Sequence, residues 1–136
     1  LIIFSYKYVA LRMECKYGFS FKHPLACMEK YPENAVYYLN DAIRDENIEL
    51  AKTLLAKGAD INAKERHGWP PLFIALREHN MNFGRDNTEM VELLLTNGAE
   101  INFADEYGNT ALDLAVSDKM KQLLLQYGAK NGKDLQ

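Results

Sequence analysis

Internal repetition constrains this chain more strongly than any other feature. The pentapeptide Gly-Ala-Asp-Ile-Asn at 58–62 returns as Gly-Ala-Glu-Ile-Asn at 98–102, and an imperfect third copy begins with Gly-Ala at 128–129. Each copy follows a similar apolar block, at 53–55, 93–95 and 123–125. Repetition at this period is typical of a solenoid, in which each unit packs against its neighbours. The functional question therefore becomes what the chain binds.

Apolar residues at helical spacing precede each glycine block. They recur every three or four residues through six segments, at 36–43, 48–55, 70–76, 88–95, 110–116 and 119–127. A glycine just past the second segment of each pair provides a left-handed helix cap at little cost. The sequence therefore predicts an all-α solenoid of stacked helix-turn-helix units.

A continuous apolar strip should lie between the layers of this stack, because one helix pair cannot bury its apolar face alone. The predicted strip consists of Leu39, Ala42, Leu50, Leu54, Leu55, Leu72, Ala75, Leu76, Val91, Leu94, Leu95, Leu112, Ala115, Leu123 and Leu124. Beyond it, residues 131–136 are expected to form a frayed tail.

The segment Gly-Asn-Thr-Ala-Leu-Asp-Leu-Ala at 108–115 resembles the signature of the ankyrin repeat family. The second unit matches the signature at 68–75, and the first begins to match at 37–42. The resemblance covers residues 34–136 and implies about three repeats, at approximately 34–66, 67–106 and 107–136. Residues 1–33 then form a separate leader.

Two departures from the family pattern concern the spacing of the glycine blocks. Ankyrin repeats recur about every 33 residues, whereas here the spacing is 40 and then 30 residues. We assign the extra residues to the inter-helix loop at 77–87, and the missing ones to the turn at Ser117-Asp118.

A further departure concerns the signature of repeat two. The Thr and His of the signature are replaced by Pro70 and Phe73, which predicts a weaker hydrogen-bonded link at repeat two.

The leader at 1–33 is rich in aromatic residues and does not follow the repeat. Alternating patterns at 6–8 and 19–21 are typical of half-buried strands, so we expect a short β-hairpin or an irregular wrap there. A short helix is predicted from Pro24 to Lys30, ended by a following proline. Residues 13–33 are predicted to cover the first repeat as a cap.

The two cysteines of the chain, Cys15 and Cys27, both lie in the leader. Two cysteines do not make a disulfide framework, so we interpret them as free buried thiols in a reducing compartment. A zinc site that adds His23 is the weaker alternative, because the paired short spacing of zinc ligands is missing. The predicted location is cytoplasmic, with a secreted effector as the alternative.

Composition and motif content disfavour several function classes. A net charge of −3 offers no basic face for nucleic acid, and no apolar stretch approaches the ~20 residues needed to insert into a membrane. The three histidines at 23, 67 and 79 fall in different predicted loops, with no local nucleophile–base pair. We therefore predict a non-enzymatic chain with no catalytic residues, metal or cofactor.

The family resemblance implies binding through the tips of the turns between repeats and through the concave face of the first helices. The first turn tip is residues 64–69 and the second is residues 103–109. The candidate partner-binding residues are Lys64, Arg66, His67, Trp69, Phe103, Asp105, Glu106 and Tyr107. Aromatic residues and arginine dominate protein interfaces. Two alternatives remain: Trp69 could lie over Pro70 or the neighbouring tip, and the opposite charges of the tips could pair with each other.

Met81 and Phe83, in the predicted inserted loop, are secondary binding candidates that either tuck onto the helices or anchor a partner. The whole chain is interpreted as a protein–protein interaction module with an unidentified protein partner, monomeric in preference to oligomeric. One alternative is a regulatory or targeting part of a larger enzyme. The other is a structural unit that self-associates through its β-prone leader.

Overall fold

The computed structural model describes Cys15, residues 24–81 and residues 87–136, with residues 78–81 described by backbone alone. Within these ranges the chain is helical and contains no strand, so the predicted all-α class is confirmed. The leader patterns at 6–8 and 19–21 lie outside the described residues. The elements are α2 (Pro24–Lys30), η1 (Pro32–Asn34), α3 (Ala35–Arg44), α4 (Ile48–Ala56), α5 (Pro71–Met81), α6 (Thr88–Thr96), α7 (Ala111–Leu114), α8 (Asp118–Gln126) and η2 (Gly132–Asp134).

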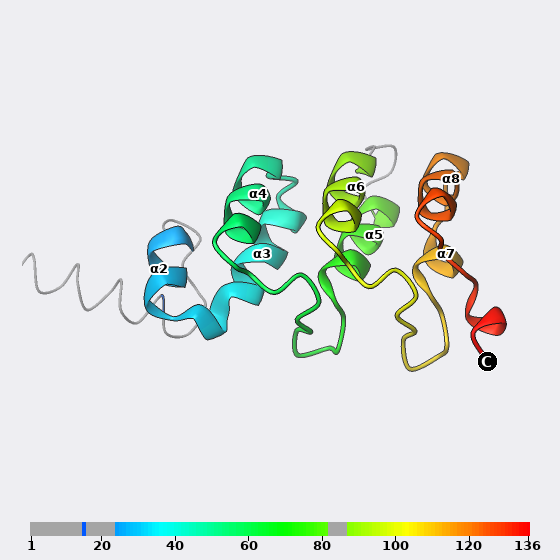
Figure 1. Cartoon of the computed structure of the whole chain (residues 1–136), viewed down its shortest axis with the longest axis horizontal. Coiled ribbons are helices and arrows are strands. Elements are labelled where there is room, and N and C mark those ends of the chain that lie inside the picture. The colour runs from blue at the N-terminus through cyan, green and yellow to red at the C-terminus, as the bar shows by residue number, and fades with distance from the viewer. Residues whose placement is uncertain (1–14, 16–23, 82–86) are drawn as a thin grey trace, which may run out of the picture.

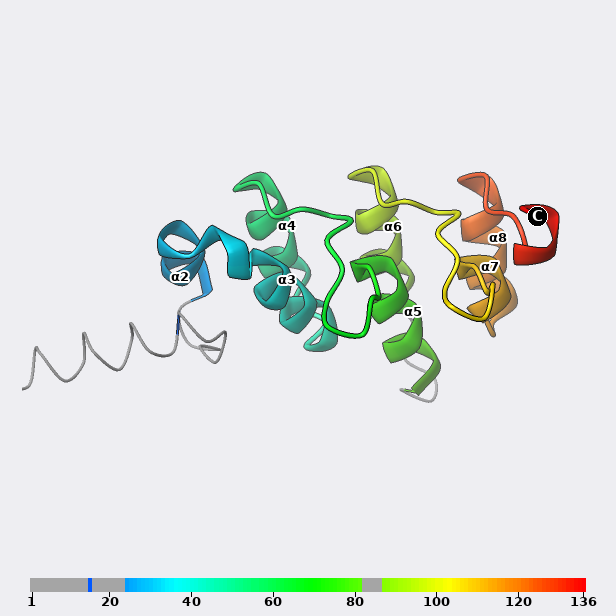
Figure 2. The ribbon, with the colours of Figure 1, turned by 90° about the horizontal axis from the view of Figure 1, so that it is seen from below.

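The helices stack as antiparallel pairs in two layers. Helices α3, α5 and α7 form one layer and α4, α6 and α8 the other, and each helix contacts the next in its own layer (Figure 1). The long connections from α4 to α5 and from α6 to α7 project from the same side of the stack, beside the first layer (Figure 2). These projecting connections carry the two turn tips.

Helices α4, α6 and α8 all end in the same Schellman cap. At the end of α4, the Ala59 N–H donates to the Leu54 carbonyl at 3.0 Å and the Gly58 N–H to the Leu55 carbonyl at 3.0 Å. The same pair of bonds closes α6 and α8. Gly58 has φ +94°, a conformation in which any residue with a Cβ is strained. The repeated Gly-Ala dipeptide therefore stops each helix and turns the chain toward a tip.

The predicted apolar strip forms the core. Buried members are Leu39, Ala42, Leu54, Leu72, Ala75, Leu76, Val91, Leu94, Leu95, Ala115 and Leu124. Leu50, Leu55, Leu112 and Leu123 are only half-buried and pack on its edge. The prediction omitted Tyr38, Met90 and Met120, which are almost completely buried. It also omitted the buried Ile43, Phe73 and Ile74, so the omissions follow from the emphasis of the predicted strip on leucine and alanine.

Two asparagines link consecutive repeats. Asn62 accepts from the Glu100 N–H at 2.8 Å and donates to the Gly98 carbonyl at 3.3 Å. Asn102 makes the equivalent bonds one unit later, to the Lys130 N–H at 2.8 Å and the Gly128 carbonyl at 3.4 Å. The last residue of each pentapeptide therefore links its own repeat to the glycine block of the next one through side-chain bonds.

The described part of the leader packs on the first repeat. Helix α2 covers the residues predicted for it, and its Cys27 and Met28 belong to the same core as α3. The carbonyl of Cys15 accepts from the Tyr38 hydroxyl at 3.1 Å and from the Asn34 side chain at 2.8 Å. Burial, followed by nearby carboxylates, raises the pKa of the Tyr38 hydroxyl, so it stays a donor.

Cys15 and Cys27 form a disulfide, so the prediction of two free thiols is wrong. Their Cα atoms lie 4.9 Å apart. The two residues are far apart in a leader without any cysteine framework, so local sequence gave no reason to pair them. The pairing arises because Cys15 and α2 both dock against α3, which places the two side chains together.

Two predicted boundaries are corrected. Helix α5 continues to Met81, so part of the predicted inserted loop, His79 included, is helical. Helix α7 ends at Leu114 rather than 116, because Ala115 is already extended, with ψ 122°. The short turn of repeat three leaves too few residues for a longer helix.

The predicted frayed tail is also wrong. The Gly132 N–H donates to the Asp113 carboxylate at 2.7 Å, and Gly132 itself is buried. The Thr110 hydroxyl lies 2.6 Å from the Lys130 carbonyl oxygen. Hydrogen bonds, the largest from the Thr110 N–H, lower the pKa of Asp113 and keep it ionised. The C-terminal segment is therefore held against the third repeat.

Candidate functional site

The two turn tips share one backbone design. In the first, the Gly68 N–H donates to the Glu65 carbonyl at 2.8 Å and the Glu65 N–H to the Trp69 carbonyl at 3.2 Å. In the second, Gly108 and Asp105 make the equivalent bonds at 3.0 Å and 2.9 Å. These paired bonds close each tip into a tight turn with the same backbone hydrogen bonds.

The acidic residue that opens each turn is used differently in the two tips. In the second tip, Asp105 Oδ1 accepts from the Tyr107 N–H at 2.9 Å and the Asn109 N–H at 2.8 Å. In the first tip, the longer Glu65 instead reaches α3 and pairs with Arg44 at 2.8 Å. Its side chain is only 10% exposed. The first tip is therefore anchored to the first-layer helix of the preceding repeat.

Asp41 lies beside this anchor on α3. Burial raises the pKa of its carboxyl, and Arg44, 3.4 Å away, opposes the shift. Asn40, on the same helix, is fully buried, and its Nδ2 lies 3.5 Å from Glu65 Oε2. Asn40, Asp41 and Arg44 thus form a polar cluster on α3. Within it, Asn40 and Arg44 contact Glu65 of the first tip.

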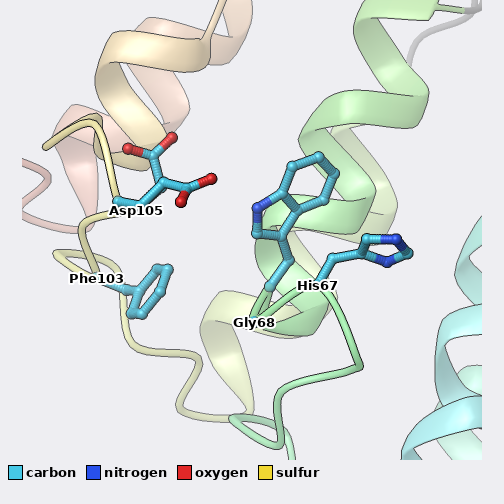
Figure 3. Close-up of a pocket in the computed structure, with 6 residues that line it drawn as sticks. His67, Gly68, Phe103 and Asp105 are labelled. Atoms are coloured by element: carbon cyan, nitrogen blue, oxygen red, sulfur yellow. The ribbon is translucent and has the colours of Figure 1, made fainter.

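A pocket of about 170 Å³ lies between the two tips. His67, Gly68 and Trp69 line it from the first tip, and Phe103, Asp105 and Glu106 line it from the second. In Figure 3 the imidazole of His67 points away from Phe103 and Asp105, so His67 borders the pocket without directing its ring into it. The pocket is therefore walled mainly by two aromatic rings and two carboxylates.

The aromatic walls are held by neighbours outside the pocket. The Arg77 guanidinium carbon lies 4.8 Å from the centre of the Trp69 ring, and Lys64 Nζ lies 4.4 Å from the centre of the Phe103 ring. Phe73 meets Phe103 edge to face with ring centres 5.1 Å apart. Cation–π and edge-to-face contacts of this kind restrict ring rotation. Both rings are therefore pre-positioned.

Phe73 also explains how repeat two manages without the signature histidine. At the matching position in repeat three, Asp113 bonds the segment that follows. Phe73 instead makes an apolar contact with the second tip through Phe103. At repeat two, where the sequence predicts a weaker hydrogen-bonded link, the structure thus has an aromatic contact between Phe73 and Phe103.

The structure brings only some of the predicted site residues together. Trp69, Phe103, Asp105 and Glu106 meet in the pocket, with His67 at its border. Tyr107 stands outside, with 81% of its surface exposed. Met81 is the last residue of α5 and its side chain is not described, and Phe83 lies outside the described residues.

The alternatives for the tips are also resolved in part. No ion pair joins Lys64 or Arg66 to Asp105 or Glu106 among the described residues, and Lys64 lies over Phe103 instead. Trp69 is half-buried and packs on the core. It is therefore neither a freely exposed anchor nor a fully covered core residue.

Sequence reasoning missed three residues that shape the site, namely Arg77, Phe73 and Glu65. Phe73 had a readable signal, since an aromatic replaces the histidine of the signature. The contacts of Arg77 and Glu65 depend on how neighbouring helices and tips lie in space, which local patterns do not encode.

No group of three or more His, Cys, Asp or Glu side chains is placed to hold a metal ion in Cys15, 24–81 and 87–136. Over the same ranges, none of the helices is both long and apolar enough to cross a bilayer.

Stacked helix pairs with projecting turn tips define the class of helical-repeat solenoids. The family model of ankyrin repeats matches residues 39–134 in three copies. The chain therefore belongs to the ankyrin repeat family, as its signature residues indicated.

The curated relatives are much longer proteins, and only a short segment of each matches this chain. The human mitochondrial disaggregase is 41% identical over 54 residues, which is 40% of this chain and 8% of that protein. The potassium channel AKT1 of Arabidopsis thaliana is 49% identical over 40 residues, 29% of this chain and 5% of the channel. The bovine mitochondrial disaggregase is 37% identical over 54 residues. The chain thus spans less than a tenth of these relatives.

Proposed function

We propose that this chain is a protein-interaction domain that binds one partner protein through its two turn tips and the adjoining concave face. Domains of this family are generally protein–protein interaction modules, and the fold provides the tips that such binding uses. The single observation that carries the proposal is the pocket between the tips, with Tyr107 exposed beside it. Aromatic side chains bring large contact area with few rotatable bonds.

Pre-organisation supports the tips as the binding surface. The anchor from Glu65 to Arg44 and the Asp105 turn bonds hold both tips in place before any partner arrives. A surface that is already ordered loses less conformational entropy on binding. The tips should therefore bind with little rearrangement.

The test begins with a binder selected from a display library of protein fragments of the source organism. Its affinity is then measured by calorimetry for wild type, Tyr107→Ala and Trp69→Ala. We expect Tyr107→Ala to weaken binding by about 1 kcal/mol or more, as truncation of an interface aromatic does. Tyr107 is so exposed that its loss should leave the melting temperature unchanged.

Tyr127→Ala is the matched control, because Tyr127 is a partly exposed tyrosine just after α8, away from the tips. It should bind like wild type. Trp69→Ala should weaken binding but also lower stability, since Trp69 packs on the core. Normal binding by both tip variants would rule out the turn tips as the binding surface.

A second candidate function is favoured by the relatives. The matched segments occupy a small part of a disaggregase and of a potassium channel, so this chain could serve as a targeting or regulatory part of a larger protein. Such a role would use the same tips. Two further points stay predictions, namely that the chain is not an enzyme and that it is monomeric. Self-association through the leader also stays a prediction, and the strand-like segments it would use lie outside the described residues.

The compartment is also a proposal. Ankyrin repeats support the cytoplasmic prediction, whereas a disulfide is uncommon in the cytosol and typical of oxidising compartments. The bond therefore favours the secreted alternative that the sequence analysis left open.

A further inference from the structure

The charged groups that line the pocket between the tips are both acidic. Asp105 and Glu106 line it, whereas Lys64 and Arg77 lie against the aromatic rings and do not line it. A carboxylate attracts a cation most strongly where nearby apolar walls exclude water, because the local dielectric constant is lower there.

Both carboxylates keep hydrogen-bonding capacity for a ligand. A carboxylate offers about four acceptor sites. Asp105 uses two on Oδ1 for its own turn and one on Oδ2, 3.3 Å from the Asn109 amide. Glu106 is exposed, and no hydrogen bond or ion pair to it is found within the described ranges.

The two rings add a second attraction for the same kind of ligand. Trp69 and Phe103 come from different tips, and each already holds a cation on its ring at less than 5 Å from the centre. The faces of Trp and Phe rings carry partial negative charge. A positive group that enters the pocket is best placed with its charge at Asp105 and Glu106, because Lys64 and Arg77 already lie against the two rings.

We propose that this pocket receives one lysine or arginine side chain of the partner protein. The inference rests on the proposed function and narrows the partner to one that presents a basic residue to the tips. The aliphatic stem would lie between Trp69 and Phe103, and the charged end would meet Asp105 and Glu106. An acidic or apolar side chain would leave both carboxylates without a counter-charge.

Trp69 is the only tryptophan of the chain and lines the pocket, so its fluorescence reports occupancy directly. The probes are capped glycine peptides with one central arginine, lysine, norleucine or glutamate. We expect the arginine and lysine peptides to change the emission saturably, with dissociation constants on the order of 1 mM. Higher ionic strength should weaken this binding.

Glu106→Gln removes one charge while keeping the shape of the side chain, and should weaken the arginine peptide about tenfold. Glu92→Gln is the matched control, because Glu92 is an exposed glutamate on α6 outside the pocket. It should titrate like wild type. Circular dichroism should show both variants folded.

Equal binding of the arginine and norleucine peptides, or no effect of Glu106→Gln, would overturn the inference. Neither result touches the proposed function, which is measured with a whole partner and with Tyr107→Ala, a residue that does not line the pocket. Conversely, Tyr107→Ala could abolish binding of the partner while Glu106→Gln has no effect on it. The proposed function would then stand, but the pocket would not receive a basic side chain of the partner.

Discussion

At the scale of single residues, burial differs among side chains that look alike in the sequence. The middle residue of each apolar block, Leu54, Leu94 or Leu124, is fully buried. The third residue is half-buried in the first block and nearly buried in the second, and Leu125 is 55% exposed. No further helix pair follows α8 among the described residues, so no next repeat packs on the third one (Figure 1). Position in the stack, rather than residue type, therefore sets how much each leucine contributes to the free energy of unfolding.

Leu94→Ala should therefore destabilise the fold by about 2–5 kcal/mol, from lost burial and the cavity left behind. Urea denaturation measures this as a lower midpoint with an unchanged slope. Leu125→Ala, in the equivalent block, should change stability by less than about 0.5 kcal/mol. Similar losses for the two variants would mean that Leu94 is not enclosed as described.

At the scale of elements, the C-terminal segment depends on close backbone packing. Gly132 lies so near Gly108 that a Cβ on it would overlap the Gly108 carbonyl oxygen. The same close approach brings the Gly132 N–H to Asp113 at 2.7 Å. The segment with η2 is thus fitted against the turn that precedes α7, which is why it is not the frayed tail that its polar composition indicated.

Gly132→Ala should release this segment, because the obstacle is backbone and cannot rotate away. We expect a loss of about 1–3 kcal/mol, typical of overpacking, and faster amide hydrogen exchange at Lys130 and at position 132. Lys133→Ala, one residue away and exposed, serves as the control and should behave like wild type. Unchanged exchange in Gly132→Ala would show that the segment is not docked on Gly108.

At the scale of the whole molecule, the stack needs its ends covered, since each repeat buries its apolar face only against neighbours. At the first repeat, α2 contributes Cys27 and Met28 to the core, and the disulfide ties α2 to Cys15. Glu29 on α2 also pairs with Lys57 beyond α4, at 3.1 Å. These contacts support the proposal that the leader acts as a cap.

A chain that begins at Asn34 should lose about 3 kcal/mol or more, since it lacks the buried side chains of Cys15, Cys27 and Met28. A buried methionine alone is worth roughly 1.5–3 kcal/mol. Thermal and urea unfolding of the truncated and full-length proteins measure this loss. The full-length protein in reductant separates the contribution of the disulfide, which chain-entropy reasoning puts at roughly 3 kcal/mol. A truncated chain as stable as the full-length one would end the cap proposal.

The sequence by itself determined the architecture, because helical periodicity, the glycine caps and the repeated blocks are local properties that each unit repeats. It also identified the tip residues, since their positions follow from the family pattern. Only the tertiary structure decided the Cys15–Cys27 bond, the docked C-terminal segment and the pocket between Trp69 and Phe103. Each of these joins residues from different units or from outside the repeats, and their meeting depends on how the layers and loops pack in space.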